Sequence, residues 1–540
     1  MTETTLRSTR PFARAATSPT GRSLLLLALV CAGALAALWL AIDPRTADLS
    51  AQIYRTQLFG REGFALWDNS WFGGHHVLGY SLVFPALAWE LGPRTVGVAA
   101  VLASSLLFAH LARRHADRHV RLAVVWFACA AAGDLFIGRL TFSLGVTFAL
   151  GCVAALSHRR PALAVVLGVA TAAASPVCGL LLAVVLLAGA GWIPPRWRLA
   201  VLGAPVVVPM LTAFLFPEGG TQPYSFGGAA SAVLIALAVH TGLARDKQAL
   251  RRGALLYAAA VAGAYVVPSP MGSNVARLGV LLAGPIFLIG ARPGRSRALV
   301  AVTCAGIVAW QAWAPVTELV KADATRATTA AYFQPLLQRL EATPHGRVEV
   351  VPTSTRWESV FIAPHVALAR GWQTQLDRRY DALFYRTRLD PLQYERWLQR
   401  LGITHVALSD APKERWGLAE ARLLRHPPPF LHEVWRSPHW RLFAVSDPQP
   451  LVTGGSLRAL GADSFTVDAA AAGALLVRVR WTPFWTPPAG ACVERSARGF
   501  TTLRVPRPGR YVVQAAWSLS AALRSPGRLC PAAGQPLPAN

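Results

Sequence analysis

The chain has 540 residues, of which 53% are hydrophobic and only 15% charged, and its mean hydropathy is positive. This composition excludes an ordinary soluble globular protein, because the apolar content exceeds what such a chain normally carries. The formal net charge of +26 does not indicate a nucleic-acid partner, since the basic residues stand in short gaps between apolar runs and do not form one soluble basic surface.

Apolar runs fill the chain from Ser23 to about Ala314. Spans of about 15 to 20 residues predict about eleven membrane-crossing helices. The predicted spans are 23–42, 94–112, 121–133, 140–156, 161–174, 176–193, 199–216, 227–243, 253–267, 275–291 and 298–314. We therefore expect a multi-pass protein of the plasma (inner) membrane, with a transmembrane domain over residues 23–314.

Basic residues occupy every second gap between these spans. They are Arg7, Arg10, Arg14 and Arg22; Arg113, Arg114, Arg118 and Arg121; Arg159 and Arg160; Arg196 and Arg198; Arg245, Lys247, Arg251 and Arg252; and Arg292, Arg295 and Arg297. The other gaps, such as 216–226 and 268–274, contain no Lys or Arg. This positive-inside pattern predicts a cytoplasmic N-terminal tail over residues 1–22. The first run is too long, and too free of a cleavage site, to favour a signal peptide. An odd number of spans then places the C-terminal region outside the cell.

The first outward gap, residues 43–93, is by far the longest and is called loop one below. Asp43 and Asp48 follow the first span immediately, and Leu49, Ile53 and Leu58 stand near helical spacing. This spacing predicts an amphipathic helix that lies along the membrane surface.

Aromatic and polar residues alternate in the second half of loop one. The candidates for substrate binding there are Trp67, Asp68, Trp71, His75, His76 and Tyr80. Such a mixture is suited to holding sugar rings by aromatic faces and hydroxyl hydrogen bonds. The alternative is that the aromatic residues form an ordinary interfacial belt. Metal binding by His75 and His76 is disfavoured, because adjacent histidines point apart and no carboxylate stands at a matching spacing.

Further candidates lie at outward helix ends, where ionisable groups are costly unless they are paired or functional. They are Asp134, Arg139, Asn274 and Arg277, joined by Glu218 and Tyr224 from the gap at 216–226. For Arg139 the alternative role is a salt bridge to Asp134. For Glu218 the alternative role is that of an ordinary carboxylate in a loop.

Loop one carries a family resemblance. A long outward loop opened by an aspartate between the first two spans resembles the GT-C superfamily of membrane glycosyltransferases. The segments ADLSAQIYR and LWDNSWFGGHHVLGYSLVFP resemble the corresponding loop of bacterial polytopic proteins named as related to 6-pyruvoyl-tetrahydropterin synthase, although nothing in this chain resembles a soluble pterin enzyme.

The resemblance implies transfer of a sugar from a polyprenyl-phosphate donor to an acceptor on the outer face, with a loop-one aspartate as general base. Asp48 matches that position best, but no paired Asp-Asp follows the first span, so Asp43 stays an alternative. A carboxylate can take the proton of an acceptor hydroxyl, and cationic groups such as Arg139 and Arg277 can stabilise the departing phosphate. A divalent metal stays possible.

The region after Pro315 reads as an exterior part with two domains. Strand, helix and strand signals predict an α/β region over residues 315–427, and β-rich segments predict a β-sandwich-like domain over residues 428–540. Cys492 and Cys530 are the only cysteines of this part, and an oxidising exterior favours a disulfide between them over two free thiols.

The sequence thus predicts a polytopic α-helical membrane protein with a GT-C-like fold and an extracytoplasmic α/β plus β-sandwich region. Its expected function is a glycosyltransferase in cell-envelope polysaccharide biosynthesis. Its expected partners are membrane lipid, a lipid-linked sugar and an envelope polysaccharide or glycoconjugate acceptor, with no nucleic acid. A transporter or flippase for an envelope lipid or glycan, or a non-catalytic membrane scaffold, are the alternatives.

Overall fold

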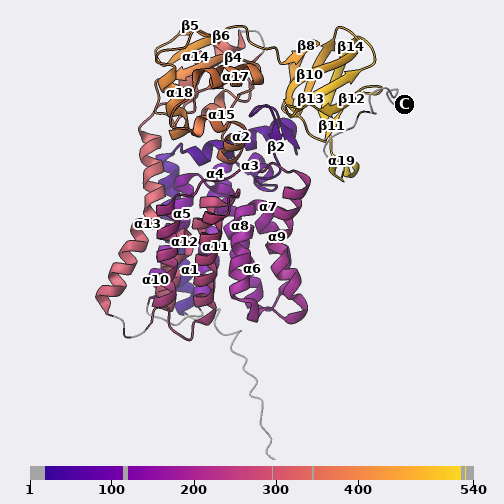
Figure 1. The fold of residues 1–540 in the computed structure, drawn as a ribbon. Helices are drawn as coiled ribbons and strands as arrows, with labels where there is room; N and C mark the ends of the chain where they lie inside the picture. The colour runs from indigo at the N-terminus through magenta and orange to yellow at the C-terminus, as the bar shows by residue number, and fades with distance from the viewer. Residues whose placement is uncertain are drawn as a thin grey trace, which may run out of the picture.

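A computed structural model describes residues 19–113, 119–292, 294, 296–342, 346–523 and 530 of the chain. The predicted tail up to residue 18 lies outside these residues, as do Arg114, Arg118 and Arg295. The described residues form a helical bundle, an α/β unit and a β-sandwich. The last two lie side by side at one end of the bundle (Figure 1).

Each of the eleven predicted spans lies on a helix of the bundle. These helices are α1 (Pro19–Ile42), α4 (Pro93–Ala112), α5 (Val120–Ile137), α6 (Leu140–Ser157), α7 (Pro161–Ala174), α8 (Pro176–Ala188), α9 (Arg198–Leu215), α10 (Phe226–Gly242), α11 (Gln248–Val266), α12 (Ala276–Gly290) and α13 (Arg297–Asp323). Seven helical segments in the described residues are long and apolar enough to cross a membrane, and α7, α8 and α10 are shorter apolar helices. The exact number of crossings stays a prediction.

The basic gaps lie together at one end of the bundle, and the gaps without Lys and Arg lie together at the other end. Leu243 and Ala291 form a β-bridge between two basic gaps. At the opposite end, the backbone N–H of Gln222 donates to the carbonyl of Ser269, across 3.0 Å, between two gaps that lack Lys and Arg. The α/β unit and the sandwich share this second end with loop one (Figure 1). This arrangement agrees with the alternation on which the topology prediction rests, while the orientation across a membrane stays a prediction.

Loop one fills the space between the bundle and the two C-terminal units. It contains α2 (Ala47–Glu62), a short hairpin of β1 (Trp67–Asp68) and β2 (His75–His76), and α3 (Phe84–Leu91). The predicted helix forms as α2, but much of it is buried rather than spread on a membrane surface. The reason is that the α/β unit covers its start. Trp357 and Trp372 donate hydrogen bonds to the carbonyls of Arg45 and Ala47, at 2.9 and 2.7 Å.

The α/β unit extends further along the chain than the sequence predicts. Its sheet has the order β3 (Arg347–Val350), β4 (Ile403–Ser409), β6 (Trp440–Val445), β5 (Leu431–Arg436), with only the β3–β4 pair parallel. Five helices accompany it: α14 (Ala330–Glu341), α15 (Glu358–Phe361), α16 (Thr374–Tyr380), α17 (Pro391–Leu401) and α18 (Leu418–Leu423). The strands at 431–445 were expected in the sandwich, but they complete this sheet because β6 pairs with β4. The sandwich therefore begins at Val452 instead of residue 428.

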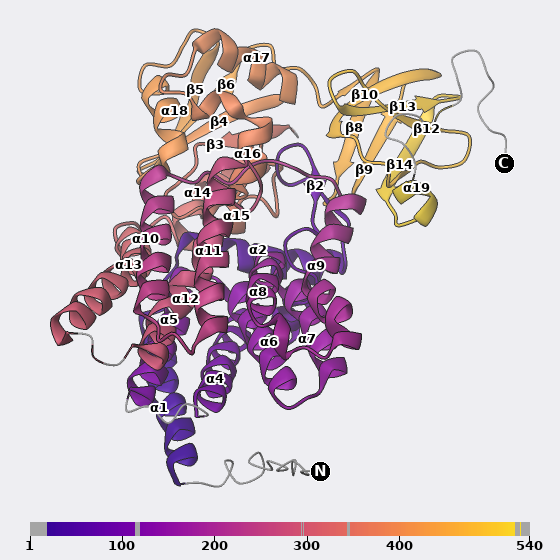
Figure 2. The ribbon, with the colours of Figure 1, turned by 60° about the horizontal axis from the view of Figure 1, so that its bottom comes forward.

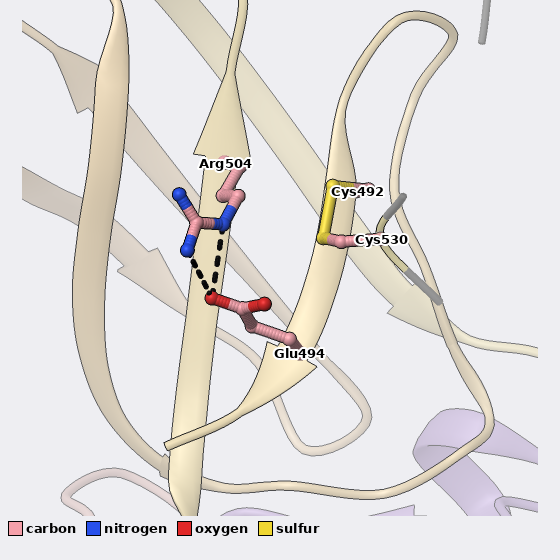
Figure 3. Close-up of a disulfide and its surroundings, with 4 residues drawn as sticks. All are labelled: Cys492, Glu494, Arg504 and Cys530. Carbon is pink, nitrogen blue, oxygen red and sulfur yellow. Dashed lines mark hydrogen bonds and ion pairs between the residues drawn. A yellow bond between two sulfur atoms is a disulfide. The ribbon is translucent and has the colours of Figure 1, made fainter. Parts of the chain in front are cut away.

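The sandwich consists of two four-stranded antiparallel sheets. One has the order β12 (Cys492–Arg495), β13 (Phe500–Val505), β10 (Gly473–Arg480), β7 (Val452–Thr453), and the other β11 (Trp485–Thr486), β14 (Gly509–Ala515), β9 (Ser464–Ala469), β8 (Gly455–Leu460). The short helix α19 (Leu519–Leu523) follows β14. Figure 2 shows the sandwich beside the α/β unit. A disulfide joins Cys492, at the start of strand β12, to Cys530 (Figure 3).

Candidate functional site

The candidate site lies where α2 begins and the α5–α6 turn passes close beneath it. The hydroxyl of Thr46 donates to the carbonyl of Ile137, across 2.7 Å. Gly138 has a φ of +90°, and a Cβ there would lie 2.5 Å from the backbone nitrogen of Leu49. A side chain at residue 138 would thus be strained and would push α2 away. This close approach brings Arg139 beside Asp48.

Arg139 links two carboxylates at this point. Its Nε donates to Oδ2 of Asp48, across 2.9 Å, and its Nη1 lies 3.8 Å from Oδ1 of Asp134. The side chains of Arg139 and Asp48 are 22% and 24% exposed, so both can reach solvent or a ligand. Asp134 is buried, and its carbonyl accepts the backbone N–H groups of Gly138 and Arg139. The predicted Arg139–Asp134 ion pair exists, but the nearer partner is Asp48.

A second guanidinium faces the same cluster. Arg277, in the first turn of α12, donates from Nη2 to Oδ1 of Asn274, across 2.7 Å. It lies within electrostatic range of Asp48, Asp134 and Arg139. Within the described residues, the Nε of Arg277 has no hydrogen-bond partner. The site therefore holds two guanidinium groups and two carboxylates.

An apolar groove begins directly below Arg277. The guanidinium lies 5.3 Å from the ring centre of Phe142, and Phe142 is one of the residues that line the groove. The other lining residues come from α6, α8 and α12 and are all apolar, among them Val146, Leu181 and Leu278. A groove of this composition can take a hydrocarbon chain, with a charged head at the arginines.

Tyr80 and Gln52 border the site on the side of loop one. The side-chain amide of Gln52 donates to the hydroxyl of Tyr80, across 2.5 Å. Tyr80 also meets the ring of Trp372 edge to face, with ring centres 6.0 Å apart. Trp372 comes from the α/β unit, so this unit contributes a wall near Asp48.

Asp43 stands apart from this cluster in its contacts. It has a φ of +51° and forms ion pairs with Arg94 and Arg45. Its side chain is 40% exposed. Asp43 therefore joins the end of α1 to the start of α4, whereas Asp48 faces the two arginines described above.

The remaining loop-one candidates are buried against other parts of the protein. Trp67 belongs to the core of the sandwich, and Trp71 stacks on Tyr54 with ring centres 4.3 Å apart. Asp68 accepts hydrogen bonds from the Tyr54 hydroxyl and the Ser70 backbone, at 2.7 and 2.9 Å. His75 is fully buried and lies beside Trp71. These positions give the four residues a packing role, and a sugar-binding role for them stays a prediction.

Three further candidates also contact residues other than Asp48. They are His76, Glu218 and Tyr224. The imidazole Nδ1 of His76 lies 2.8 Å from Oε1 of Glu218, and its Nε2 lies 3.0 Å from the hydroxyl of Thr482 in the sandwich. Tyr380 donates to Oε2 of Glu218, across 3.5 Å. Tyr224 is half-buried, and its hydroxyl donates to the carbonyl of Gly228, across 3.4 Å. His76 and Glu218 join the bundle and loop one to the two C-terminal units.

Sequence reasoning missed two kinds of residue near the site. Gln52 follows Asp48 by four residues on a predicted helix, so helical spacing could have placed both side chains on one face. Trp357 and Trp372 lie more than 300 residues from the carbonyls they contact, and no local signal identifies them. Among the described residues, no group of three or more His, Cys, Asp and Glu side chains is arranged to hold a metal ion.

Comparison with known proteins finds similarity at the level of solved structures. No family model and no curated protein matches the chain. The structure of the arabinofuranosyltransferase AftD from Mycobacteria is similar with a TM-score of 0.47 and 14% identity, covering 94% of this chain and 58% of AftD. The oligosaccharyltransferase AglB from Archaeoglobus fulgidus, solved with an inhibitory peptide and a dolichol-phosphate, is similar with a TM-score of 0.41 and 11% identity, covering 73% of this chain and 70% of AglB.

One of these structures is of an arabinofuranosyltransferase and the other of an oligosaccharyltransferase. This chain spans less than two thirds of the length of AftD. At such identities the similarity concerns the fold alone, and no residue role is transferred from either enzyme.

Proposed function

We propose that this chain is a membrane glycosyltransferase that moves a sugar from a polyprenyl-phosphate donor to a cell-envelope acceptor on the outer face. The observation that carries the proposal is the position of Asp48: it is paired with Arg139 across 2.9 Å and lies within electrostatic range of Arg277, which stands above an apolar groove. A carboxylate, two guanidinium groups and a channel for hydrocarbon together match the needs of this reaction.

The apolar groove accounts for the lipid part of the donor. Its lining between α6, α8 and α12 is apolar throughout, and Phe142 lies both in this lining and under Arg277. A prenyl chain in the groove would place its phosphate beside Arg277 and Arg139. Arginine binds phosphate oxygens through paired N–H donors, and Arg277 has an Nε without a partner in the described residues.

The transfer step then needs a base and a stabilised leaving group. Asp48 takes the proton of the acceptor hydroxyl while the acceptor oxygen forms a bond to the anomeric carbon. The bond between that carbon and the phosphate oxygen breaks, and its electron pair leaves with the phosphate. Arg139 and Arg277 stabilise the charge that develops on the leaving oxygen.

The ion pair between Arg139 and Asp48 gives the donor a second effect. A donor phosphate that binds Arg139 competes with Asp48 for the Nε–H group of Arg139. Loss of that hydrogen bond frees the carboxylate oxygen of Asp48 to accept a hydrogen bond from the acceptor hydroxyl. Donor binding would thus prepare Asp48 for proton transfer.

The exterior units would position the acceptor. Trp372 of the α/β unit lies against Tyr80 and binds the carbonyl of Ala47, one residue before Asp48. An acceptor glycan held by the α/β unit and the sandwich would therefore arrive on the outward side of the site.

The test is turnover of a polyprenyl-phosphate-linked sugar by purified protein in lipid nanodiscs. Asp48→Asn should keep folding and lipid binding and lower turnover by about 100-fold or more, the usual scale for loss of a general base. Asp43→Asn is the matched control and should lower turnover less, because Asp43 pairs with Arg94 and Arg45. The reverse ranking moves the base to Asp43. Full activity of both single variants and of the double variant rejects the glycosyltransferase in favour of transport or scaffolding.

A further inference from the structure

A second pocket lies on the other side of Tyr80, within loop one. It is enclosed by α2, the segment 63–65, the segment 77–82 and Pro85 at the start of α3. Apart from Arg55, Ser81 and Gly63, the residues that line it are apolar. None of these residues belongs to the groove between α6, α8 and α12, so the pocket is a separate feature of the molecule.

Among the described residues that line the pocket, Arg55 is the only charged one, and its guanidinium is incompletely paired. The side chain is 2% exposed, and Nη1 donates to the carbonyl of Val77 at the long distance of 3.4 Å. Within the described residues, Nε and Nη2 of Arg55 have no hydrogen-bond partner. A buried guanidinium with two unused donors is costly, because each unpaired polar group loses its hydration without a replacement.

The carboxylates of the described part of the chain do not supply the missing partner. Asp68 and Glu218 are near enough to act on Arg55 electrostatically, but each is engaged elsewhere. Asp68 accepts from Tyr54 and Ser70, and Glu218 pairs with His76. The faces of Arg55 are covered by the rings of Trp71 and Tyr80, at 5.8 and 4.9 Å.

The mouth of the pocket borders exposed apolar side chains. Phe64 lines the pocket and is 66% exposed, while Trp89 packs against Gly60 of α2 and is 52% exposed. The span of α4 begins directly after α3, at Pro93. The pocket thus opens where loop one meets the predicted lipid boundary, and an aromatic rim at that level is typical of contact with lipid headgroups and acyl chains.

We propose that this pocket binds an anionic membrane lipid, with its phosphate on Nε and Nη2 of Arg55 and part of an acyl chain against the apolar lining. A free anion would gain nothing from the apolar walls, and a lipid without a phosphate would leave the guanidinium unpaired. The site is distinct from the donor groove and does not depend on catalysis. Because Tyr80 touches both Arg55 and Gln52, the bound lipid would form one wall next to the candidate site.

The experiment is native mass spectrometry of the purified full chain after addition of phosphatidylglycerol or of diacylglycerol, which has the same acyl chains and no phosphate. The wild type should retain phosphatidylglycerol in preference to diacylglycerol. Arg55→Gln should reduce that retention by about tenfold or more, because a charge-assisted hydrogen bond to the phosphate is lost. Arg61→Gln is the matched control on the same helix, and it should retain the lipid as the wild type does, because Arg61 is exposed and does not line the pocket.

A second variant tests the proposal independently, in case Arg55→Gln does not fold. Phe64→Glu places a negative charge at an exposed position of the mouth, so it should fold normally and also weaken phosphatidylglycerol retention. Equal retention by wild type and both variants, or equal retention of the two lipids by the wild type, overturns the proposal. Inorganic phosphate that displaces the lipid at millimolar concentration from the wild type would also overturn it, since the apolar walls would then contribute nothing.

Discussion

Arg139 donates from Nε to Oδ2 of Asp48 across 2.9 Å, and this contact joins the N-cap of α6 to the first turn of α2. The two residues are 91 positions apart in the chain. The contact joins the proposed base, Asp48, to a proposed phosphate-binding group, Arg139. A change in either residue should therefore affect both proton removal and phosphate binding.

Arg139→Lys should lower kcat/KM by about tenfold, and Arg139→Gln by about 100-fold or more. The guanidinium faces Asp48 and Asp134 at once, at 2.9 and 3.8 Å, and a single ammonium group cannot reproduce that fork. Turnover of a lipid-linked sugar is the readout, with the melting temperature as a check of folding. Arg94→Gln, which removes a partner of Asp43, is the control and should retain most activity. A larger loss in Arg94→Gln than in Arg139→Gln would contradict the assignment.

A reporter enzyme that is active only outside the cytoplasm should be active when fused after Asn540. The same reporter inserted at Arg252 should be inactive, because that gap is one of the basic ones. The structure places the C-terminal units at the end of the bundle where the gaps lack Lys and Arg, so both fusions test one orientation. Activity at Arg252 together with silence after Asn540 would invert the topology.

The α/β unit should lose stability as the pH rises from about 5 to 8. Burial, together with the nearby carboxylate of Asp377, raises the pKa of Asp381 to about 7, and burial likewise raises that of Glu420 to about 7. Both values exceed the roughly 4 of an unfolded chain, so the folded state binds more protons in this window. The stabilising protonated forms are fully present below about pH 4 and lost as the pH passes about 7.

Asp377 does not cancel this trend. Although burial alone would raise its pKa, the ion pair with Arg370 lowers it, so Asp377 loses its charge only on the acid side of the window. Asp381→Asn should keep the hydrogen bond from Trp397 and flatten the dependence of melting temperature on pH. The gain at pH 8 should be on the order of 1 kcal/mol or more. Asp447→Asn makes the same chemical change at an exposed position and should retain the wild-type slope. An unchanged slope in Asp381→Asn would refute the argument.

Reduction of the Cys492–Cys530 disulfide should destabilise the sandwich by about 2–4 kcal/mol, the usual range for a cross-link that closes a loop of this size. The two cysteines are 38 positions apart, and Cys492 begins β12. Thermal unfolding with and without reductant gives the shift, and alkylation before and after reduction counts the masked thiols. The Cys492→Ser/Cys530→Ser variant should no longer respond to reductant. Free labelling of both cysteines without reductant would exclude the pair.

The sequence predicted features that depend on local composition. The eleven helices that carry the predicted spans follow from apolar runs of sufficient length. Arg139 was identified as a charge at an outward helix end, and Asp48 as the loop-one aspartate that the family resemblance implies. Their pairing was not predicted, because contacts between residues so far apart leave no local pattern. For the same reason the strands at 431–445 were assigned to the sandwich, although β4 is the partner of β6. Trp71 was expected to face a ligand, and composition alone could not indicate that Gly371 and Tyr54 cover it.

Asn69 holds the sandwich to loop one. Its side-chain amide donates to the carbonyls of Gly461 and Ser464, at 2.9 and 3.1 Å, in the turn between β8 and β9. Its Oδ1 accepts from Nε1 of Trp67, across 2.8 Å, and Trp67 is buried in the core of the sandwich. The backbone N–H of Asn69 donates to the carbonyl of Ala462 in the same turn.

Asn69→Ala should therefore loosen the sandwich without unfolding the bundle. Three side-chain hydrogen bonds are lost and the indole N–H of Trp67 is left buried without its acceptor, at a cost of about 1–3 kcal/mol. Amide hydrogen exchange in the turn at 461–464 should become faster, while exchange in α5 and α6 should not change. Asn69→Asp retains the acceptor for Trp67 but sets a buried carboxylate oxygen against the two carbonyl oxygens, so its exchange should be at least as fast as that of Asn69→Ala. If the sandwich positions the acceptor, Asn69→Ala should also raise KM for the acceptor and leave donor binding unchanged. Faster exchange with an unaltered acceptor KM would separate the sandwich from acceptor recognition, whereas unchanged exchange would show that Asn69 does not hold it.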